Sequence, residues 1–274
     1  MSRTVSDLPS ALAHHEELAA RIDGQRLAVF LDFDGTLSPV AERPDLAVIS
    51  ESMRDIVAVL SKRCPVAVVS GRGRADVHQR VGLDTLFYAG SHGFDIAGPA
   101  DQPVRHQVGT EFTAELEAVE GKLRTALDRV KGVLFEPKTA SLSVHYRLVQ
   151  PADRATVRGA VRRVLDDHPG LRILLGKMIF EVQPRLDWNK GSAVLWLLRA
   201  LGLDGPDVVP VYVGDDITDE DAFAAIKSIG IGVFVDGRDE TDPGRATAAD
   251  YHVEGTAEVG LLLRFLIERA RRRA

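Results

Sequence analysis

The most reactive residue types in this sequence stand at the end of an apolar run. Residues 27–37 read LAVFLDFDGTL, in which Asp32 and Asp34 flank a single phenylalanine before Gly35. In an extended strand, residues i and i+2 share a face, so both carboxylates would point into one crevice. Such a pair repels unless a cation such as Mg²⁺ neutralises it, and an aspartate can also be a nucleophile that forms an aspartyl-phosphate. The alternative is a plain turn at Asp34-Gly35 with Asp32 as a cap.

Two further positions offer groups that can hold a phosphate. Ser70 and Gly71 end the run PVAVVSG and supply a small hydroxyl and a backbone amide, although a helix-capping role for Ser70 explains the same pattern. Lys190 opens a helical stretch, where its charge opposes the helix dipole. As a point charge it would neutralise phosphate, and a solvated side chain is the alternative.

A fourth group of reactive residues is acidic. The segment VYVGDDITDEDAF contains Asp215, Asp216, Asp219, Glu220 and Asp221 directly after an apolar run. A helix N-terminus favours acidic residues, which accounts for the last three of them. The first two stand at the exit of the strand, where that explanation is weaker. Asp215 could therefore complete a metal site with the aspartates of the first loop.

Short apolar runs alternate with helix-like stretches, which is typical of an open, parallel α/β sheet. Ligands bind such sheets outside the carboxyl ends of the strands. The reactive residues lie just beyond a strand or at the start of a helix, and so stand where such a sheet binds ligands. The expected strands are 27–33, 65–70, 85–90, 208–214 and 230–235, and the expected helices are 51–62, 73–81, 190–202, 218–227 and 256–271.

The chain between residues 105 and 185 has a different pattern, with paired strands beside helices. This pattern predicts an antiparallel α+β insertion, which we interpret as a cap over the ligand end of the sheet. The expected domains are a core made of 1–104 and 186–274 and a cap made of 105–185. Within the cap, helices are expected at 110–130 and 153–167, and strands at 133–137, 140–147, 171–175 and 178–183.

Alternation along these strands separates an apolar face from a polar one. The apolar face contains Leu142, Val144, Tyr146, Met178, Phe180 and Val182. It would pack on the cap helices, while the polar face is either solvated or binds sugar hydroxyls. The charged members of the polar face are Glu136, Lys138, His145, Arg147, Lys177 and Glu181.

Composition excludes several classes of protein. The 274 residues are 45% hydrophobic with a net charge of −6, which allows a large core and argues against nucleic acid or a membrane as the main partner. One cysteine, Cys64, excludes an internal disulfide framework, and the polar residues 1–25 do not resemble a signal peptide. We therefore expect a cytoplasmic protein, and a monomer, whose partner is a small molecule.

Together, these motifs resemble the haloacid dehalogenase superfamily of phosphohydrolases. The strings LDFDGTLSPV, VVSGR, GSHG, GKMIFEVQP, NKG and VGDDITDEDAF are more specific and resemble the trehalose-6-phosphate phosphatase family. The resemblance extends from about residue 27 to residue 235 and leaves out the first 25 residues and the C-terminal helix. It implies a Rossmann-like parallel-sheet core with helices on both faces, plus an inserted α+β cap domain with an antiparallel sheet.

The resemblance also implies roles for the core residues. Asp32 would attack the phosphorus, and Asp34 would protonate the leaving sugar oxygen and then activate water. Ser70, Gly71 and Lys190 would hold the phosphoryl group during its transfer.

The metal and sugar sites are implied in the same way. Mg²⁺ would be bound by Asp32, by the backbone carbonyl of Asp34 and by Asp215, with Asp216 and Asp219 as nearby supports. The implied substrate-binding residues of the cap are Glu136, Lys138, Arg147, Lys177 and Glu181.

The resulting hypothesis is Mg²⁺-dependent hydrolysis of trehalose 6-phosphate through an aspartyl-phosphate. A phosphatase of another sugar phosphate, such as sucrose 6-phosphate or mannosyl-3-phosphoglycerate, is the nearest alternative. A protein that only binds the sugar phosphate is the alternative from another class. The joint presence of Asp32, Asp34, Lys190 and Asp215 argues against it.

Overall fold

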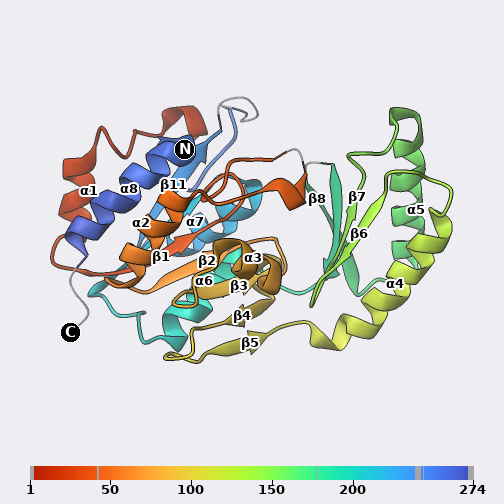
Figure 1. The fold of residues 1–274 in the computed structure, drawn as a ribbon, viewed down its shortest axis with the longest axis horizontal. Helices are drawn as coiled ribbons and strands as arrows, with labels where there is room; N and C mark the ends of the chain where they lie inside the picture. Colours follow the sequence, from red (N-terminus) through yellow and green to blue (C-terminus); the bar gives the residue numbers. More distant parts are fainter. Residues whose placement is uncertain (1–2, 42, 177, 238–241, 243, 271–274) are drawn as a thin grey trace. The chain divides into compact units, whose positions relative to one another are not determined.

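The structure is a computed structural model that describes residues 3–41, 43–176, 178–237, 242 and 244–270. The chain divides into two compact units, both drawn in Figure 1. Unit 1 combines the chain up to His106 with the chain from Trp188 onward, and unit 2 is Gln107–Asp187. Within the described part of the chain, no helix has both the length and the apolar character needed to cross a bilayer.

The sheet of unit 1 has eight strands among the described residues, in the order β12-β11-β10-β1-β2-β3-β4-β5 (Figure 1). The strands from β12 to β3 run parallel, and β4 pairs with β3 in the antiparallel direction. Their bounds are β1 Arg26–Leu31, β2 Val66–Val69, β3 Phe87–Gly90, β4 Asp95–Ala97, β5 Arg105–Gln107, β10 Val208–Gly214, β11 Ile231–Asp236 and β12 Tyr251–Glu254.

Helices cover both faces of this sheet because its strands are apolar on both sides. In β1, Val29 and Leu31 face one hydrophobic cluster, whereas Ala28 and Phe30 face the other. The first cluster includes residues of α1 (His15–Ile22), α2 (Glu51–Ser61), α3 (Arg74–Val81) and α8 (Gly255–Arg269). The second includes residues of α6 (Lys190–Ala200) and α7 (Glu220–Ile226). The predicted α/β class is confirmed.

Among its described residues, unit 2 contains an antiparallel sheet in the order β6-β7-β9-β8 and two α-helices. Leu142, Val144, Phe180 and Val182 are buried with the helices, which confirms the predicted apolar face at these four positions. Pro137 lies at the edge of the sheet, where a residue without an N–H is tolerated. The bounds are α4 Thr113–Ala126, β6 Leu134–Pro137, β7 Leu142–His145, α5 Arg154–Asp166, β8 Leu171–Gly176 and β9 Ile179–Pro184.

One predicted strand is too long. Strand β7 ends at His145, because the chain then turns and the Val149 N–H donates to the Tyr146 carbonyl (3.1 Å). Met178 has a φ of 62° and so lies outside β9 as well. Tyr146 still stacks on Phe180, with ring centroids 4.7 Å apart, whereas Arg147 lies in the exposed turn.

Aromatic contacts within unit 1 hold the chain segments that lead into and out of unit 2. The ring of His106 stacks on Trp196, with centroids 4.5 Å apart, and lies 5.2 Å from the ring of Trp188. Trp188 Nε1 donates to the Gly93 carbonyl at 2.9 Å. Because Trp188 is two residues before α6, these contacts also fix the start of that helix.

Candidate active site

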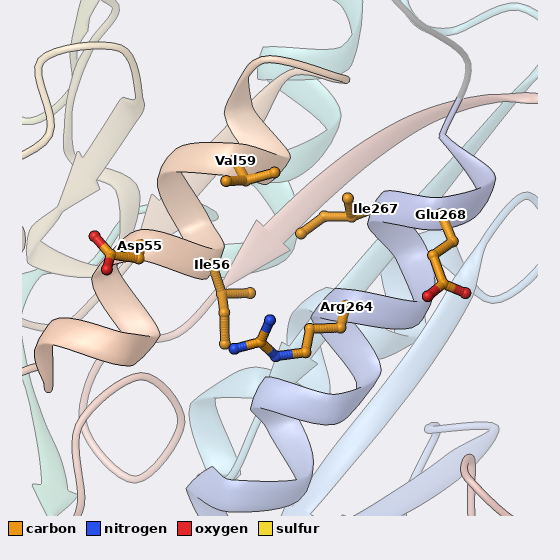
Figure 2. Close-up of a pocket in the computed structure, with 6 residues that line it drawn as sticks. All are labelled: Asp55, Ile56, Val59, Arg264, Ile267 and Glu268. Carbon is orange, nitrogen blue, oxygen red and sulfur yellow. The ribbon is translucent and has the colours of Figure 1, made fainter.

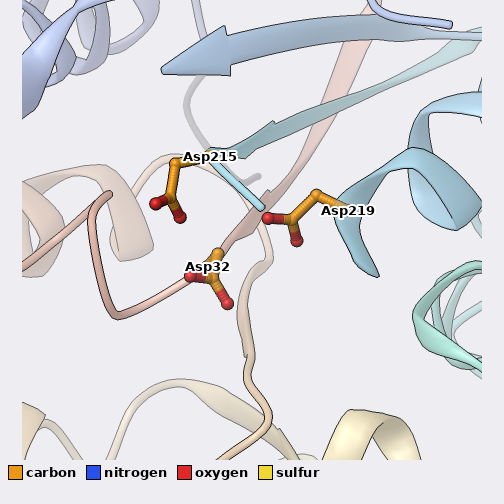
Figure 3. Close-up of side chains that lie close together, drawn as sticks. All are labelled: Asp32, Asp215 and Asp219. Atoms are coloured by element: carbon orange, nitrogen blue, oxygen red, sulfur yellow. The ribbon is translucent and has the colours of Figure 1, made fainter. Parts of the chain in front are cut away.

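Three aspartates converge at the carboxyl ends of β1 and β10. Asp32 follows β1, and its N–H donates to Val213 of β10 at 2.9 Å, which places Asp32 beside the loop that starts at Asp215. Carboxylate oxygens of Asp32, Asp215 and Asp219 lie within 4.8 Å of one another. Figure 3 shows the three side chains pointing toward a common space.

A buried lysine links two of these carboxylates. Lys190 Nζ donates to Asp32 Oδ1 and to Asp219 Oδ1, each at 2.7 Å, and its side chain is only 2% exposed. Asn189 caps the helix by accepting from the Ser192 N–H at 2.9 Å, which turns the first residue of α6 inward. The alternative of a solvated lysine is therefore wrong.

Asp219 is completely enclosed by donors. Its Oδ1 also accepts from the Tyr212 hydroxyl at 2.6 Å, and its Oδ2 accepts from the Asp216 N–H at 2.9 Å. Tyr212 has no exposed surface and was not among the predicted site residues. The signal was a tyrosine in an otherwise apolar strand, since a buried hydroxyl needs a partner. Asp216 caps the turn after β10 by accepting from the Ile217 N–H.

The charges of this cluster are unbalanced. Burial raises the pKa of Asp32 to about 8, although the Lys190 ammonium acts in the opposite direction. Burial, followed by the charges of Asp32 and Asp219, raises the pKa of Asp215 well above its ordinary value. Burial alone would lower the pKa of Lys190, but Asp219 and Asp32 outweigh it and raise that pKa. A further cation would relieve this excess of carboxylate.

The donor set fits Mg²⁺. Asp215 Oδ1 is buried and has no hydrogen-bond partner among the described residues. The loop after β1 passes directly against this carboxylate, since a Cβ added at Gly35 (φ +83°) would clash with Asp215 Oδ2. Oxygen ligands are those that Mg²⁺ prefers.

The loop after β2 stands next to this cluster in the sheet. Ser70 is 1% exposed, and its Oγ accepts from the Arg72 N–H at 3.1 Å. The GSHG turn at residues 90–93 supports this loop, because Ser91 and His92 donate their N–H groups to the carbonyls of Arg72 and Ser70. An added Cβ at Gly71 would meet the His92 ring at 2.8 Å, so the GSHG turn shapes the predicted phosphate loop.

Asp34 points to the loop after β2. Its two oxygens accept from Arg72, Nε to Oδ2 at 2.6 Å and Nη2 to Oδ1 at 2.7 Å. Arg72 stands in the VVSGR string but was not among the predicted site residues. Its side chain is 10% exposed, whereas that of Asp34 is 42% exposed.

The polar face of unit 2 is a second hydrogen-bonded cluster. Glu181, which is 5% exposed, accepts from Lys138 Nζ at 3.1 Å, from Ser141 Oγ at 2.5 Å and from Ser143 Oγ. The two serines were not predicted as site residues, although the alternation placed Ser143 on this face. Their hydroxyls supply donors that a buried carboxylate requires.

The remaining sugar-site predictions are distributed as follows. Glu136 Oε2 lies 2.8 Å from His145 Nε2, on the same polar face. Burial alone would raise the pKa of Glu136, but His145 and the charge of Lys138 outweigh it and lower that pKa. Arg147 is exposed in the turn after β7, and Lys177 lies outside the described residues.

A groove elsewhere on unit 1 does not coincide with these residues. It lies between α2 and α8 (Figure 2) and is separate from the loops that hold the predicted site. Its lining residues are Asp55, Ile56, Val59, Arg264, Ile267 and Glu268.

Comparison with known proteins gives a consistent result. A family model described as trehalose-phosphatase matches residues 30–257. A probable trehalose-phosphate phosphatase 3 of Oryza sativa subsp. japonica is 40% identical over 277 residues, which cover 95% of this chain and 74% of that protein.

Solved structures have the same fold. The C-terminal domain of trehalose-6-phosphate phosphatase from C. albicans aligns with a TM-score of 0.77 at 22% identity, covering 95% of this chain and 99% of that one. A haloacid dehalogenase-like hydrolase from Bacteroides thetaiotaomicron aligns with a TM-score of 0.64 at 16% identity, covering 89% and 99%.

Proposed function

This chain belongs to the trehalose-phosphatase family, and we propose that it hydrolyses trehalose 6-phosphate to trehalose and inorganic phosphate. It is a phosphoric monoester hydrolase. The observation that supports the proposed chemistry best is the cluster of Asp32, Asp215 and Asp219 around Lys190 at the carboxyl edge of the sheet. It combines a carboxylate nucleophile with a cation for the phosphoryl group.

The reaction would proceed in two displacements. In the first, an oxygen of Asp32 attacks the phosphorus, the bond from phosphorus to the sugar oxygen breaks, and protonated Asp34 gives its proton to that oxygen. In the second, water attacks the phosphorus of the aspartyl-phosphate while the Asp34 carboxylate accepts a water proton. The bond to Asp32 then breaks and releases phosphate. Lys190, Ser70 and the amide of Gly71 stabilise the transferring group.

Mg²⁺ is the proposed cofactor. Asp32, the backbone carbonyl of Asp34 and Asp215 would hold it, while Asp219 orients Lys190 and Asp216 caps the turn beside them. When bound, the ion supplies neutralisation of charge on the phosphate and on the carboxylates.

Unit 2 is proposed to be the cap domain that selects the sugar. The family resemblance assigns trehalose binding to Glu136, Lys138, Arg147, Lys177 and Glu181. The hydrogen-bonded face formed by Glu136, Lys138 and Glu181 supports this proposal, because carboxylates and ammonium groups match the donors and acceptors of sugar hydroxyls. Closure of a cap would also exclude water from the reaction.

Phosphate release from trehalose 6-phosphate, glucose 6-phosphate and sucrose 6-phosphate, with Mg²⁺ and with EDTA, tests the proposal. We expect Mg²⁺-dependent release from trehalose 6-phosphate. Asp32→Asn should lower kcat by about 10⁴-fold or more. Asp207→Asn is the matched control, because Asp207 is exposed, lies directly before β10 and pairs with Arg26 at the amino end of β1.

The alternatives predict other results. Release from sucrose 6-phosphate or mannosyl-3-phosphoglycerate in preference to trehalose 6-phosphate would keep the aspartate chemistry and contradict the assignment of unit 2. Full activity of Asp32→Asn would contradict the role of Asp32 as the nucleophile. Binding of trehalose 6-phosphate without turnover would indicate a sugar-phosphate-binding protein.

A further inference from the structure

The Asp34 carboxylate is held by both of its oxygens. The contacts from Arg72 at 2.6 and 2.7 Å form a bidentate pair between a guanidinium and a carboxylate. Charge-assisted pairs of this geometry fix the orientation of the carboxylate as well as its distance. Asp34 is otherwise a half-exposed side chain on a loop, so its position depends on this partner.

Arg72 is itself held from several directions. Its Nη1 donates to Asp76 Oδ2 of α3 at 3.0 Å, and its guanidinium carbon lies 5.4 Å from the centroid of the Phe33 ring. Its backbone N–H donates to Ser70 Oγ, and its carbonyl accepts from the Ser91 N–H. Asp76 is held in turn by Arg80 Nε at 2.9 Å. The guanidinium therefore occupies one position set by β1, the loop after β2 and α3.

We propose that Arg72 is a positioning residue for proton transfer, which holds Asp34 where it meets the leaving sugar oxygen. The inference rests on the proposed acid and base roles of Asp34. Each Asp34 oxygen keeps a second lone pair outside the two bonds from Arg72, so it can carry and transfer a proton while Arg72 holds the carboxyl group. Two parallel bonds also fix the rotation of the carboxyl group, whereas a single bond leaves it free to turn.

The test compares two leaving groups. Trehalose 6-phosphate releases a sugar oxygen that must gain a proton, whereas p-nitrophenyl phosphate releases a stable phenolate that needs none. The value of kcat/KM reports the steps up to departure of the leaving group and excludes hydrolysis of the aspartyl-phosphate. Loss of a group that acts only on the leaving oxygen should therefore lower kcat/KM for the sugar phosphate selectively.

The expected results differ among four variants. Asp34→Asn should lower kcat/KM for trehalose 6-phosphate by about 10²–10⁴-fold and affect the aryl ester far less. Arg72→Gln should lower it by about 100-fold, again selectively. Arg72→Lys keeps the charge and one hydrogen bond, so its value should lie between those of Arg72→Gln and the unmodified protein. Arg26→Gln, which changes an exposed arginine at the amino end of β1, is the matched control and should stay within a few-fold on both esters.

The outcomes separate the inference from the function beneath it. Equal losses on both esters in Arg72→Gln and Arg72→Lys would mean a structural role or a phosphate contact and would overturn the inference. A gain in kcat/KM would mean that Arg72 restrains the acid, which also overturns it. If Asp34→Asn lowers kcat/KM equally for both esters, the acid role of Asp34 is wrong. Arg72 then has no proton transfer to position. If the loss of kcat/KM is selective for trehalose 6-phosphate in Asp34→Asn but not in Arg72→Gln, only the role of Arg72 is overturned.

Discussion

Each unit of this protein holds a lysine whose side chain is almost fully buried against a carboxylate, and the two centres differ in charge balance. In unit 1, Lys190 is 2% exposed and lies between Asp32 and Asp219, with Asp215 beside them. In unit 2, the Lys138 side chain is 6% exposed and faces Glu181, which also accepts from the hydroxyls of Ser141 and Ser143. Among the described residues, the first centre places three carboxylates around one ammonium, whereas in the second the Glu181 carboxylate pairs with the Lys138 ammonium and with two hydroxyls.

This difference corresponds to the ligands proposed for the two centres. Burial of unpaired charge is costly, so an excess of carboxylate persists only where a cation compensates it. A centre that binds Mg²⁺ and a phosphate requires such an excess. A carboxylate that pairs with an ammonium and with hydroxyls needs no metal ion, and such a cluster can present oriented polar groups to a neutral sugar. The comparison therefore predicts that equivalent changes in the two centres have different consequences.

Lys190→Met should have the largest effect. It removes the ammonium that balances Asp32 and Asp219 and that would stabilise the transferring phosphoryl group. We expect a loss of about 10³-fold in kcat for both trehalose 6-phosphate and p-nitrophenyl phosphate, because phosphoryl transfer is common to both esters. Lys227→Met, which changes a half-exposed lysine of unit 1, is the control. A loss confined to the sugar phosphate would contradict the difference between the centres.

Lys138→Met should affect only recognition of the sugar. The change leaves Glu181 with the hydroxyls of Ser141 and Ser143 and removes a charged donor. We expect kcat/KM for trehalose 6-phosphate to fall about 10- to 100-fold through KM, the usual effect of losing a hydrogen bond to a charged group. Activity on p-nitrophenyl phosphate should stay unchanged, as it should in the exposed control Lys131→Met. A parallel fall on the aryl ester would place Lys138 in phosphoryl transfer instead.

Asp215→Asn should abolish stabilisation by Mg²⁺. A ligand that binds only the folded state adds about 2.7 kcal/mol at 100 times its Kd, which raises Tm by about 5 °C for a chain of this size. Thermal unfolding with EDTA and with Mg²⁺ measures this shift without any substrate. Glu181→Gln should retain the full shift, because the centre in unit 2 needs no ion. An undiminished shift in Asp215→Asn would exclude Asp215 as a ligand.

The sequence predicted most elements of both units because their signal is local, but it missed the short strands β4, β5 and β12. Burial of β1 on both faces and the alternation of Leu142 and Val144 are visible as patterns of apolar residues. The pairing of Lys190 is not local, since its partner Asp32 is 158 residues away in the chain. A lysine at a helix start is compatible with solvent or with a buried site, and only the packing of α6 on the sheet decides between them.

The site residues that were not predicted from the sequence all act through another side chain. Tyr212 holds Asp219, Arg72 holds Asp34, and Ser143 holds Glu181. A sequence reveals groups that can do chemistry by type and spacing, but the partner of such a group is set by tertiary structure. A polar residue within a buried strand was the available signal for Tyr212 and Ser143.

The smallest expected effect concerns pH, where the two centres should respond in opposite directions. The pKa of Glu136 is lowered, so its ionised form contributes stability above the unfolded-state value of about 4.5 and loses it as the pH falls through the folded-state value. In metal-free protein, the raised pKa of Asp32 has the reverse sign, and its contribution is lost as the pH rises toward about 8.

Glu136→Gln should therefore be destabilising at neutral pH and progressively less so below about pH 4.5. Urea unfolding from pH 7 to pH 3 measures the gap in free energy of unfolding, with Glu117→Gln on the exposed side of α4 as the control. A gap that stays constant would mean that the contact between His145 and Glu136 does not favour the ionised carboxylate, and the second centre would then lack its oriented polar face.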